Sequence, residues 1–205
     1  SVHEEIVRFW LKTDNKRSGL IDTSISGSLS TLSAPARAAV STAYYDLTAK
    51  ALDIPISERI GLDPTLQGAA GQCMVTLGHS SPDEIASKLK LLPASPILKV
   101  KLGSAHDKDA LNAIKVLDSR PLFLDANQGW EHPDEALMAI SIAGRSRVVG
   151  LEQPFTRDRW DLHMELRRLT DVPVFGDESI QGMADIERAV SAFDGVNLKL
   201  MKCGG

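Results

Sequence analysis

Residues 96–127, PILKVKLGSAHDKDALNAIKVLDSRPLFLDAN, contain the pattern that decides the fold. Two short apolar runs, 96–103 and 121–127, flank a stretch with helical spacing at 107–118. This pattern is typical of a βαβ unit, in which a helix joins two parallel strands. The same alternation continues along the chain in both directions. Further strands are expected at 72–78, 148–154, 172–179 and 195–201, and further helices at 82–92, 133–143, 158–169 and 183–193.

Five of the six expected strands carry a charged side chain near their carboxyl end, although buried parallel strands are normally apolar throughout. These residues recur at intervals of 22 to 27 positions, which is the period of a repeating βα unit. The strand ends of a barrel converge on one axis, whereas those of an open sheet are spread out in a row. A shared site therefore favours an α/β fold of the TIM-type (β/α) barrel kind over a doubly wound sheet. The residues are Lys101, Asp125, Glu152, Asp177 and Lys199, and Lys99 lies on the same strand face as Lys101.

Asp125, Glu152 and Asp177 place three carboxylates at equivalent positions on successive strands. Clustered carboxylates repel one another and ionise together only beside a cation. Because no histidine or cysteine accompanies them, the pattern predicts Mg²⁺, or else Mn²⁺, rather than zinc. We expect the three side chains to converge at the mouth of the barrel. Asn127 and Glu178 are candidates to orient the ligands or a lysine through hydrogen bonds.

Three lysines accompany the carboxylates. A lysine that points into a barrel needs an electrostatic or functional reason, because lysine is almost never buried without a partner. An uncharged lysine amine is a usable general base. If Lys101 and Lys199 face opposite sides of one substrate, the first can remove an α-proton and the second can return one. Lys99 is the candidate helper of this pair.

The composition argues against several other classes of protein. The net charge is -4 and there is no basic block, so nucleic acid and anionic membrane are poor candidates for a partner. No apolar run approaches the roughly 18 residues that a membrane helix needs. Two cysteines without a CxxC pattern fit reduced thiols in a cytoplasm. The histidines without ligand spacing, which we expect in solvent or at helix caps, are His79, His106, His132 and His163.

The motifs that carry these residues resemble those of a known group. ILKVKLG, FLDANQGW, LEQPF, FGDESI and VNLKLMKCGG are similar, in order and spacing, to the successive motifs of the muconate-lactonizing-enzyme subgroup of the enolase superfamily. The resemblance covers about residues 70–205 and implies a Mg²⁺-dependent enzyme with a lysine base. It assigns Asp125, Glu152 and Asp177 as metal ligands, Lys101 and Lys199 as acid/base groups, and Lys99 as their helper.

Within this subgroup, VNLKLMKCGG is most similar to dipeptide (L-Ala-D/L-Glu) epimerases. The resemblance then implies an isomerase that abstracts the α-proton of a small carboxylate substrate, a dipeptide, through an enediolate. The alternatives within the subgroup are N-acylamino acid racemase, o-succinylbenzoate synthase and muconate cycloisomerase. An alternative of another class is a non-catalytic barrel that serves as a scaffold. A homo-oligomer is compatible with each of these hypotheses.

The resemblance also divides the chain. Residues 1–70 correspond to the helical part of an N-terminal α+β capping domain, and residues 71–205 to a partial (β/α) barrel with six of its strands. Members of the family have a strand meander before the cap helices and two more barrel strands after the sixth. We therefore expect the sequence to be part of a longer protein.

Overall fold

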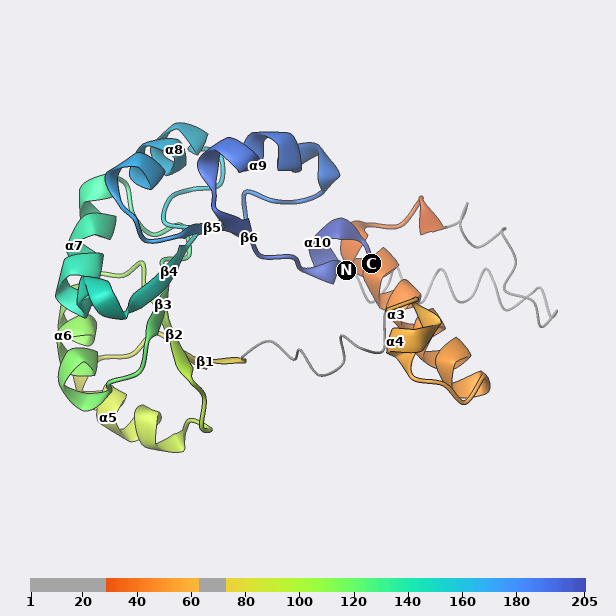
Figure 1. The fold of residues 1–205 in the computed structure, drawn as a ribbon, viewed down its shortest axis with the longest axis horizontal. Helices are drawn as coiled ribbons and strands as arrows, with labels where there is room; N and C mark the ends of the chain where they lie inside the picture. Colours follow the sequence, from red (N-terminus) through yellow and green to blue (C-terminus); the bar gives the residue numbers. More distant parts are fainter. Residues whose placement is uncertain (1–28, 63–72) are drawn as a thin grey trace. The chain divides into compact units, whose positions relative to one another are not determined.

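A computed structural model describes residues 29–62 and 73–205, and Figure 1 gives the labels of its elements. These residues form two compact units. The first comprises residues 29–62 and 198–205, and the second comprises residues 73–197. The predicted domain boundary at residue 70 lies outside the described residues and stays a prediction.

The second unit contains a six-stranded parallel sheet whose strands are ordered as in the chain. Figure 1 shows its helices along the outer, convex side of the curved sheet. Each strand is followed by a helix that returns the chain for the next parallel strand, as expected for the predicted α/β barrel part. The strands are β1 (Met74–Leu77), β2 (Ile97–Lys101), β3 (Leu122–Asp125), β4 (Val148–Glu152), β5 (Val174–Gly176) and β6 (Gly195–Val196).

The helices of the second unit begin where the sequence predicts. The helix α7 begins at Pro133, and the carboxylate of Glu135 accepts a hydrogen bond from the backbone N–H of His132 at 3.0 Å. This satisfies an amide that has no partner within the helix. The helices are α5 (Pro82–Leu91), α6 (Asp107–Leu117), α7 (Pro133–Ala143), α8 (Trp160–Leu169) and α9 (Ile186–Ala192), with the 3₁₀ turns η2 (Arg145–Arg147) and η3 (Met183–Asp185).

The two faces of the sheet differ because side chains alternate along each strand. On β2, Leu98 and Val100 are buried in the apolar core that the sheet shares with its helices. Lys99 and Lys101 point to the opposite face, which we call the inner face. The core therefore holds the helices on one side of the sheet and leaves the inner face for other side chains.

The end of the sheet differs from the prediction. The expected strand 195–201 is wrong in its second half, since β6 ends at Val196 and the short helix α10 (Leu200–Cys203) follows. The run Leu198–Met201 alternates apolar and basic residues as a strand would, but leucine, lysine and methionine are also good helix formers. Gly204, with φ +94°, ends the helix in a left-handed conformation.

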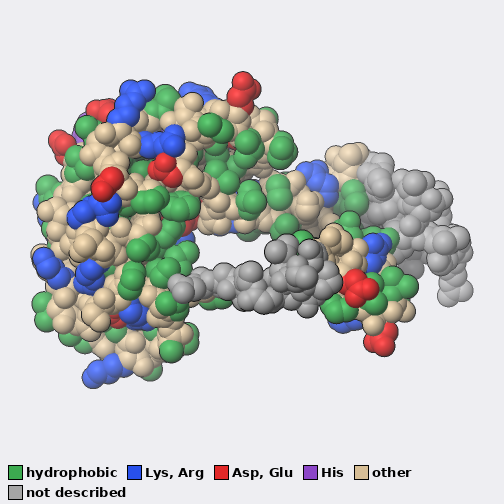
Figure 2. All heavy atoms as spheres, in the orientation of Figure 1, with side chains coloured by type: hydrophobic (Ala, Val, Ile, Leu, Met, Phe, Trp, Pro, Cys, Tyr) green, Lys and Arg blue, Asp and Glu red, His purple; other side chains and the backbone are tan. Residues whose placement is uncertain are grey.

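The first unit contains α3 (Ala34–Ala51), α4 (Ile56–Arg59) and α10, which packs against α3. Pro35 lies in the first turn of α3, as predicted. None of the helices within the described residues is both long and apolar enough to cross a membrane. Figure 2 shows Lys and Arg side chains mixed with Asp and Glu side chains over the helices of the second unit.

Candidate active site

Charged side chains meet at the carboxyl end of the inner face. Lys101, Asp125 and Glu152 lie in register on three neighbouring strands. Lys99 Nζ lies 2.5 Å from Glu152 Oε2 and 2.9 Å from Asp125 Oδ2, and Lys101 Nζ lies 2.6 Å from Asp125 Oδ2. Asn197 joins this group, because its side-chain amide donates to Glu152 Oε1 at 2.9 Å. We call these five residues the polar cluster.

Two ammonium groups compensate the two carboxylates of the polar cluster. Asp125 and Glu152 are only 1% and 2% exposed, so their charges need close partners. Burial alone lowers the pKa of Lys99, because it disfavours the charged amine. Hydrogen bonds to Glu152 and Asp125 have the opposite effect and prevail, so the pKa of Lys99 lies above its usual value. Lys99 is therefore a cation at neutral pH, which suits a helper better than a base.

Asp177, the third predicted carboxylate, follows β5 and is 2% exposed. Its backbone N–H donates to the side chain of Gln153 at 2.8 Å. The expected convergence of all three carboxylates is not observed: within residues 29–62 and 73–205, no three His, Cys, Asp or Glu side chains are grouped so that they could hold a metal ion. Lys99 instead bridges Asp125 and Glu152.

The donor chemistry of the three carboxylates nevertheless fits a divalent cation. All three are buried acids that follow or end successive parallel strands, and carboxylate oxygens are the ligands that Mg²⁺ and Mn²⁺ prefer. Asp125, Glu152 and Asp177 are the residues that would hold such an ion. Lys99 would then have to release the oxygens that it now contacts.

Two aromatic rings fill the inner face below the polar cluster. The ring centroids of Phe123 and Phe175 lie 5.2 Å apart, and Lys99 Nζ lies 5.7 Å from the Phe123 centroid. Glycines make room for the rings. A Cβ on Gly150 would lie 2.5 Å from Phe123 Cε2, and a Cβ on Gly195 would lie 2.5 Å from Phe175 Cε1. The rings thus form an apolar floor beneath the charged side chains.

The other predicted residues are placed as follows. The backbone N–H of Asn127 donates to Asp125 Oδ1 at 3.1 Å, so the printed contact is made by the main chain. Glu178 follows Asp177 in the turn after β5. Lys199 belongs to the first unit, where it precedes α10 with an extended backbone. The roles of these three residues stay predictions.

Sequence reasoning missed two residues, Asn197 and Gln153. Asn197 stands two positions before Lys199, the same spacing that places Lys99 and Lys101 on one strand face, and this signal could have revealed it. Gln153 carried no signal beyond its position directly after Glu152. Its contacts come from distant segments, which no local pattern shows.

The expectation for His163 was wrong. It is fully buried on α8, four residues from Arg159, whose carbonyl oxygen accepts a hydrogen bond from Nδ1 at 2.8 Å. Its ring packs against those of Phe155 and Phe193. Burial lowers the pKa of His163 to about 4. Position 163 shares the buried stripe of α8 with Leu166, three residues later, so the amphipathic pattern of the helix outweighs the polarity of the side chain.

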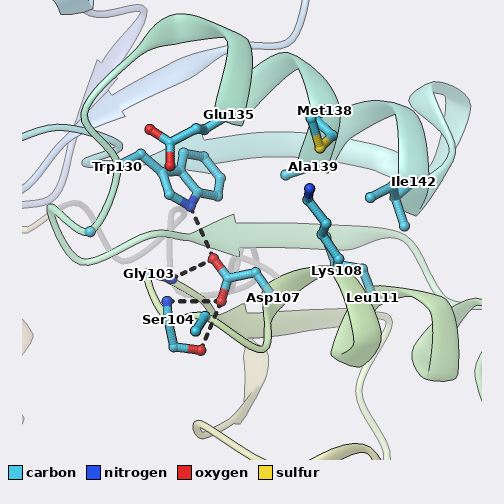
Figure 3. A pocket seen from close by; sticks show the side chains of 12 residues that line it. Gly103, Ser104, Asp107, Lys108, Leu111, Trp130, Glu135, Met138, Ala139 and Ile142 are labelled. Carbon is cyan, nitrogen blue, oxygen red and sulfur yellow. Dashed lines mark hydrogen bonds between the residues drawn. The ribbon is translucent and has the colours of Figure 1, made fainter.

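A cavity of about 390 Å³ lies between α6 and α7, and it contains none of the predicted site residues. Figure 3 shows Asp107 and Trp130 pointing toward each other, and Trp130 Nε1 donates to Asp107 Oδ2 at 3.0 Å. The same carboxylate accepts from the backbone N–H groups of Gly103 and Ser104 at 2.8 and 2.9 Å. Asp107 therefore ties the loop after β2 to the loop after β3.

Parallel strands that carry buried carboxylates and lysines at their carboxyl ends define a (β/α)-barrel protein with a charged site at its mouth. Residues 88–205 match the family described as Enolase C-terminal domain-like, and the chain belongs to that family.

Individual relatives narrow the comparison. The L-Ala-D/L-Glu epimerase of Bacteroides thetaiotaomicron is 36% identical over 179 residues, which cover 87% of this chain and 46% of the relative. The crystal structure of N-succinyl Arg/Lys racemase from Bacillus cereus has 28% identity and a TM-score of 0.70, covering 83% of this chain and 48% of that one. A dipeptide epimerase from Enterococcus faecalis, complexed with Mg and L-Leu-L-Tyr, has 29% identity and a TM-score of 0.70, covering 85% and 50%. The chain spans about half the length of these relatives.

Proposed function

We propose that the chain is part of a cytoplasmic, Mg²⁺-dependent epimerase that moves the α-proton of a dipeptide. The observation that carries this proposal is the polar cluster, in which two lysines contact buried carboxylates at the mouth of a parallel sheet. The similarity to dipeptide epimerases supports the choice of substrate. The intact lysines and carboxylates argue against a barrel that serves only as a scaffold.

The proposed reaction needs two bases and one stable cation. Lys101 removes the α-proton from one face of the substrate, and Lys199 returns a proton to the other face. Lys99 remains charged, because its hydrogen bonds to the carboxylates favour the ammonium form. An intact cluster therefore offers both a proton acceptor and a fixed positive charge beside the substrate.

Asp125, Glu152 and Asp177 are the proposed ligands of Mg²⁺, for which Mn²⁺ can substitute. When bound, the ion supplies positive charge that stabilises the negative charge developing on the substrate carboxylate. Asn197 holds the side chain of Glu152 in place through Oε1. Asn127 and Glu178 are proposed to orient these ligands.

A second candidate function is racemisation of an N-acylated amino acid. It is favoured by the similarity to the N-succinyl Arg/Lys racemase of Bacillus cereus, which is as high in TM-score as that to the dipeptide epimerase. Both substrates carry a carboxylate next to the reacting carbon, so the polar cluster suits either. The lyase and cycloisomerase alternatives need one base rather than two.

Exchange of the α-proton in D₂O tests this proposal. The full-length protein with Mg²⁺ is incubated with each epimer of Ala-Glu, and separately with each enantiomer of N-succinyl-arginine, and deuterium uptake is followed by NMR. If Lys101 and Lys199 are independent bases, Lys101→Ala exchanges only one stereoisomer and Lys199→Ala only the other. Removing a positioned base typically costs about 10²–10⁴-fold in rate, so the surviving half-reaction will be distinct.

Lys115→Ala is the matched control, because Lys115 is exposed on α6. It should exchange both stereoisomers like the wild type. Equal exchange of both stereoisomers by both active-site variants contradicts the assignment of the bases. Exchange abolished by one variant, with unchanged stereochemistry in the other, indicates a one-base enzyme instead.

A further inference from the structure

Gln153 is a fully buried amide at the junction of two strand ends. It follows Glu152 directly and has a left-handed backbone, with φ +38°. Its Oε1 accepts hydrogen bonds from the backbone N–H groups of Asp177 at 2.8 Å and of Ser179 at 3.1 Å. These two N–H groups flank Glu178, so one side-chain oxygen shapes the turn that carries Asp177.

The nitrogen of the same amide is also fully engaged. Gln153 Nε2 donates to the carbonyl oxygen of Phe155 at 3.0 Å and to Ser179 Oγ at 2.8 Å, and it lies 3.2 Å from His163 Nε2. Because the carbonyl of Arg159 can only accept, His163 Nδ1 carries the proton and Nε2 of the neutral ring accepts. The network therefore fixes which end of the amide faces Asp177.

Only an amide of this length satisfies both sets of partners. Glutamate would offer oxygens to the N–H groups of Asp177 and Ser179, but no hydrogen to His163 or to the carbonyl of Phe155. Methionine has a similar volume but leaves the two N–H groups without their acceptor. A buried donor without an acceptor is costly, so the turn would have to move to find another.

We propose that Gln153 is a positioning residue that fixes Asp177 against Glu152 and thereby sets the affinity for the divalent cation. The covalent bond to Glu152 ties Gln153 to the end of β4, and its side chain holds the residue after β5. The effect on metal affinity rests on the proposed function, in which both acids are ligands. Gln153 takes no part in proton transfer.

Hydrogen exchange of single amides tests the positioning without any metal or substrate. In the full-length protein, Gln153→Met should accelerate exchange of the Asp177 and Ser179 amides at least 10-fold. The amide of Val174, which donates to Asp194 Oδ2 in β5, should be unchanged. Gln181→Met is the matched control, since Gln181 is an exposed glutamine in the same loop. Unchanged exchange at Asp177 and Ser179 in Gln153→Met would overturn the proposal.

Titration with Mn²⁺, followed by the loss of the free-ion EPR signal, tests the consequence for the metal. Gln153→Met should weaken Mn²⁺ binding at least 10-fold, whereas Gln181→Met should stay within twofold of the wild type. At saturating metal, kcat should fall less than threefold, which separates positioning of a ligand from catalysis. Wild-type affinity in Gln153→Met would overturn the link to the metal.

A second variant covers the case in which Gln153→Met does not fold. Gln153→Asn keeps the amide but withdraws its oxygen by one methylene, and the same two changes are expected. Both variants are first compared with the wild type by circular dichroism. If the wild type itself binds no Mn²⁺, the proposed function fails, and the exchange of the Asp177 and Ser179 amides alone decides whether Gln153 positions this turn.

Discussion

The side-chain amide of Asn197 donates to Glu152 Oε1 at 2.9 Å, so a residue that follows β6 reaches past β5 to a carboxylate at the end of β4. The other oxygen of Glu152 lies 2.5 Å from Lys99 Nζ, which comes from β2. The carboxylate is therefore held by donors from both directions along the sheet. Its orientation is set by the protein itself, as preorganised sites require.

Asn197→Leu should destabilise the second unit, because it removes a donor from a buried carboxylate. A lost hydrogen bond to a charged group costs about 1–3 kcal/mol. Urea unfolding monitored by circular dichroism measures the difference as a lower midpoint. Asn112→Leu on the exposed side of α6 serves as the control. Equal midpoints for the two variants would show that the Asn197 bond contributes nothing.

Lys99→Met should be more damaging in a chelator than in Mg²⁺. Lys99 is the shared partner of Asp125 and Glu152, and removing one partner of a buried ion pair costs about 3 kcal/mol or more. A divalent cation can replace the lost charge, so millimolar Mg²⁺ should recover part of the melting temperature.

Lys115→Met provides the comparison for this pair of melts, because Lys115 is exposed. A variant of Lys99 that melts like that of Lys115 would contradict the electrostatic role of Lys99. A melting temperature of Lys99→Met that ignores Mg²⁺ would count against the metal ligands.

His163 should make stability depend on pH below about 6.5. Its pKa falls from 6.5 to about 4 on folding, mainly through burial, so the unfolded chain binds a proton first. The stabilisation is complete above pH 6.5 and is lost as the pH falls toward 4. The loss reaches about 3 kcal/mol, at roughly 1.4 kcal/mol for each unit of pKa shift.

Urea unfolding between pH 4 and 7 measures this dependence. His163→Gln should have a flatter profile than the wild type, since its side chain does not titrate. His79→Gln, at an exposed position, should keep the wild-type profile. Parallel profiles for the wild type and His163→Gln would refute the assignment.

Gly150→Ala should destabilise the protein by overpacking. The new Cβ would lie 2.5 Å from Phe123 Cε2 and 2.9 Å from Phe175 Cε2, and such insertions typically cost about 1–3 kcal/mol. The double variant Gly150→Ala with Phe123→Leu should recover stability relative to the sum of its single changes. Gly78→Ala is the control, because no heavy atom lies within 4 Å of its Cβ position. Additive effects of the two changes would mean that the ring and the glycine do not share the space.

Most of the sheet could be predicted from the sequence, because each strand and helix has a local signal. The strand that ends at Asp125 is apolar until its last residue, and α7 begins with proline followed by two acids. The run Leu198–Met201 was read wrongly, since its alternation suits a strand and its composition suits a helix. Local patterns decide an element only where they agree.

The site was predictable where its residues are charged and periodic, as for Lys101, Asp125 and Glu152. The amides Asn197 and Gln153 escaped because their partners lie 45 and 24–26 residues away. His163 escaped for a related reason, since a polar side chain on a buried stripe finds its partner only in the folded chain. Long-range hydrogen bonds leave no period in the sequence.

The order of the strands also bears on how the protein folds. Every strand of the sheet pairs with the next one along the chain, so each βα unit can dock onto the one before it as synthesis proceeds. The contact between Lys99 and Glu152 skips a strand, and it can form only after β2, β3 and β4 are in place. We therefore expect the charges of the polar cluster to come together late, after the hydrophobic core has already set the register of the strands.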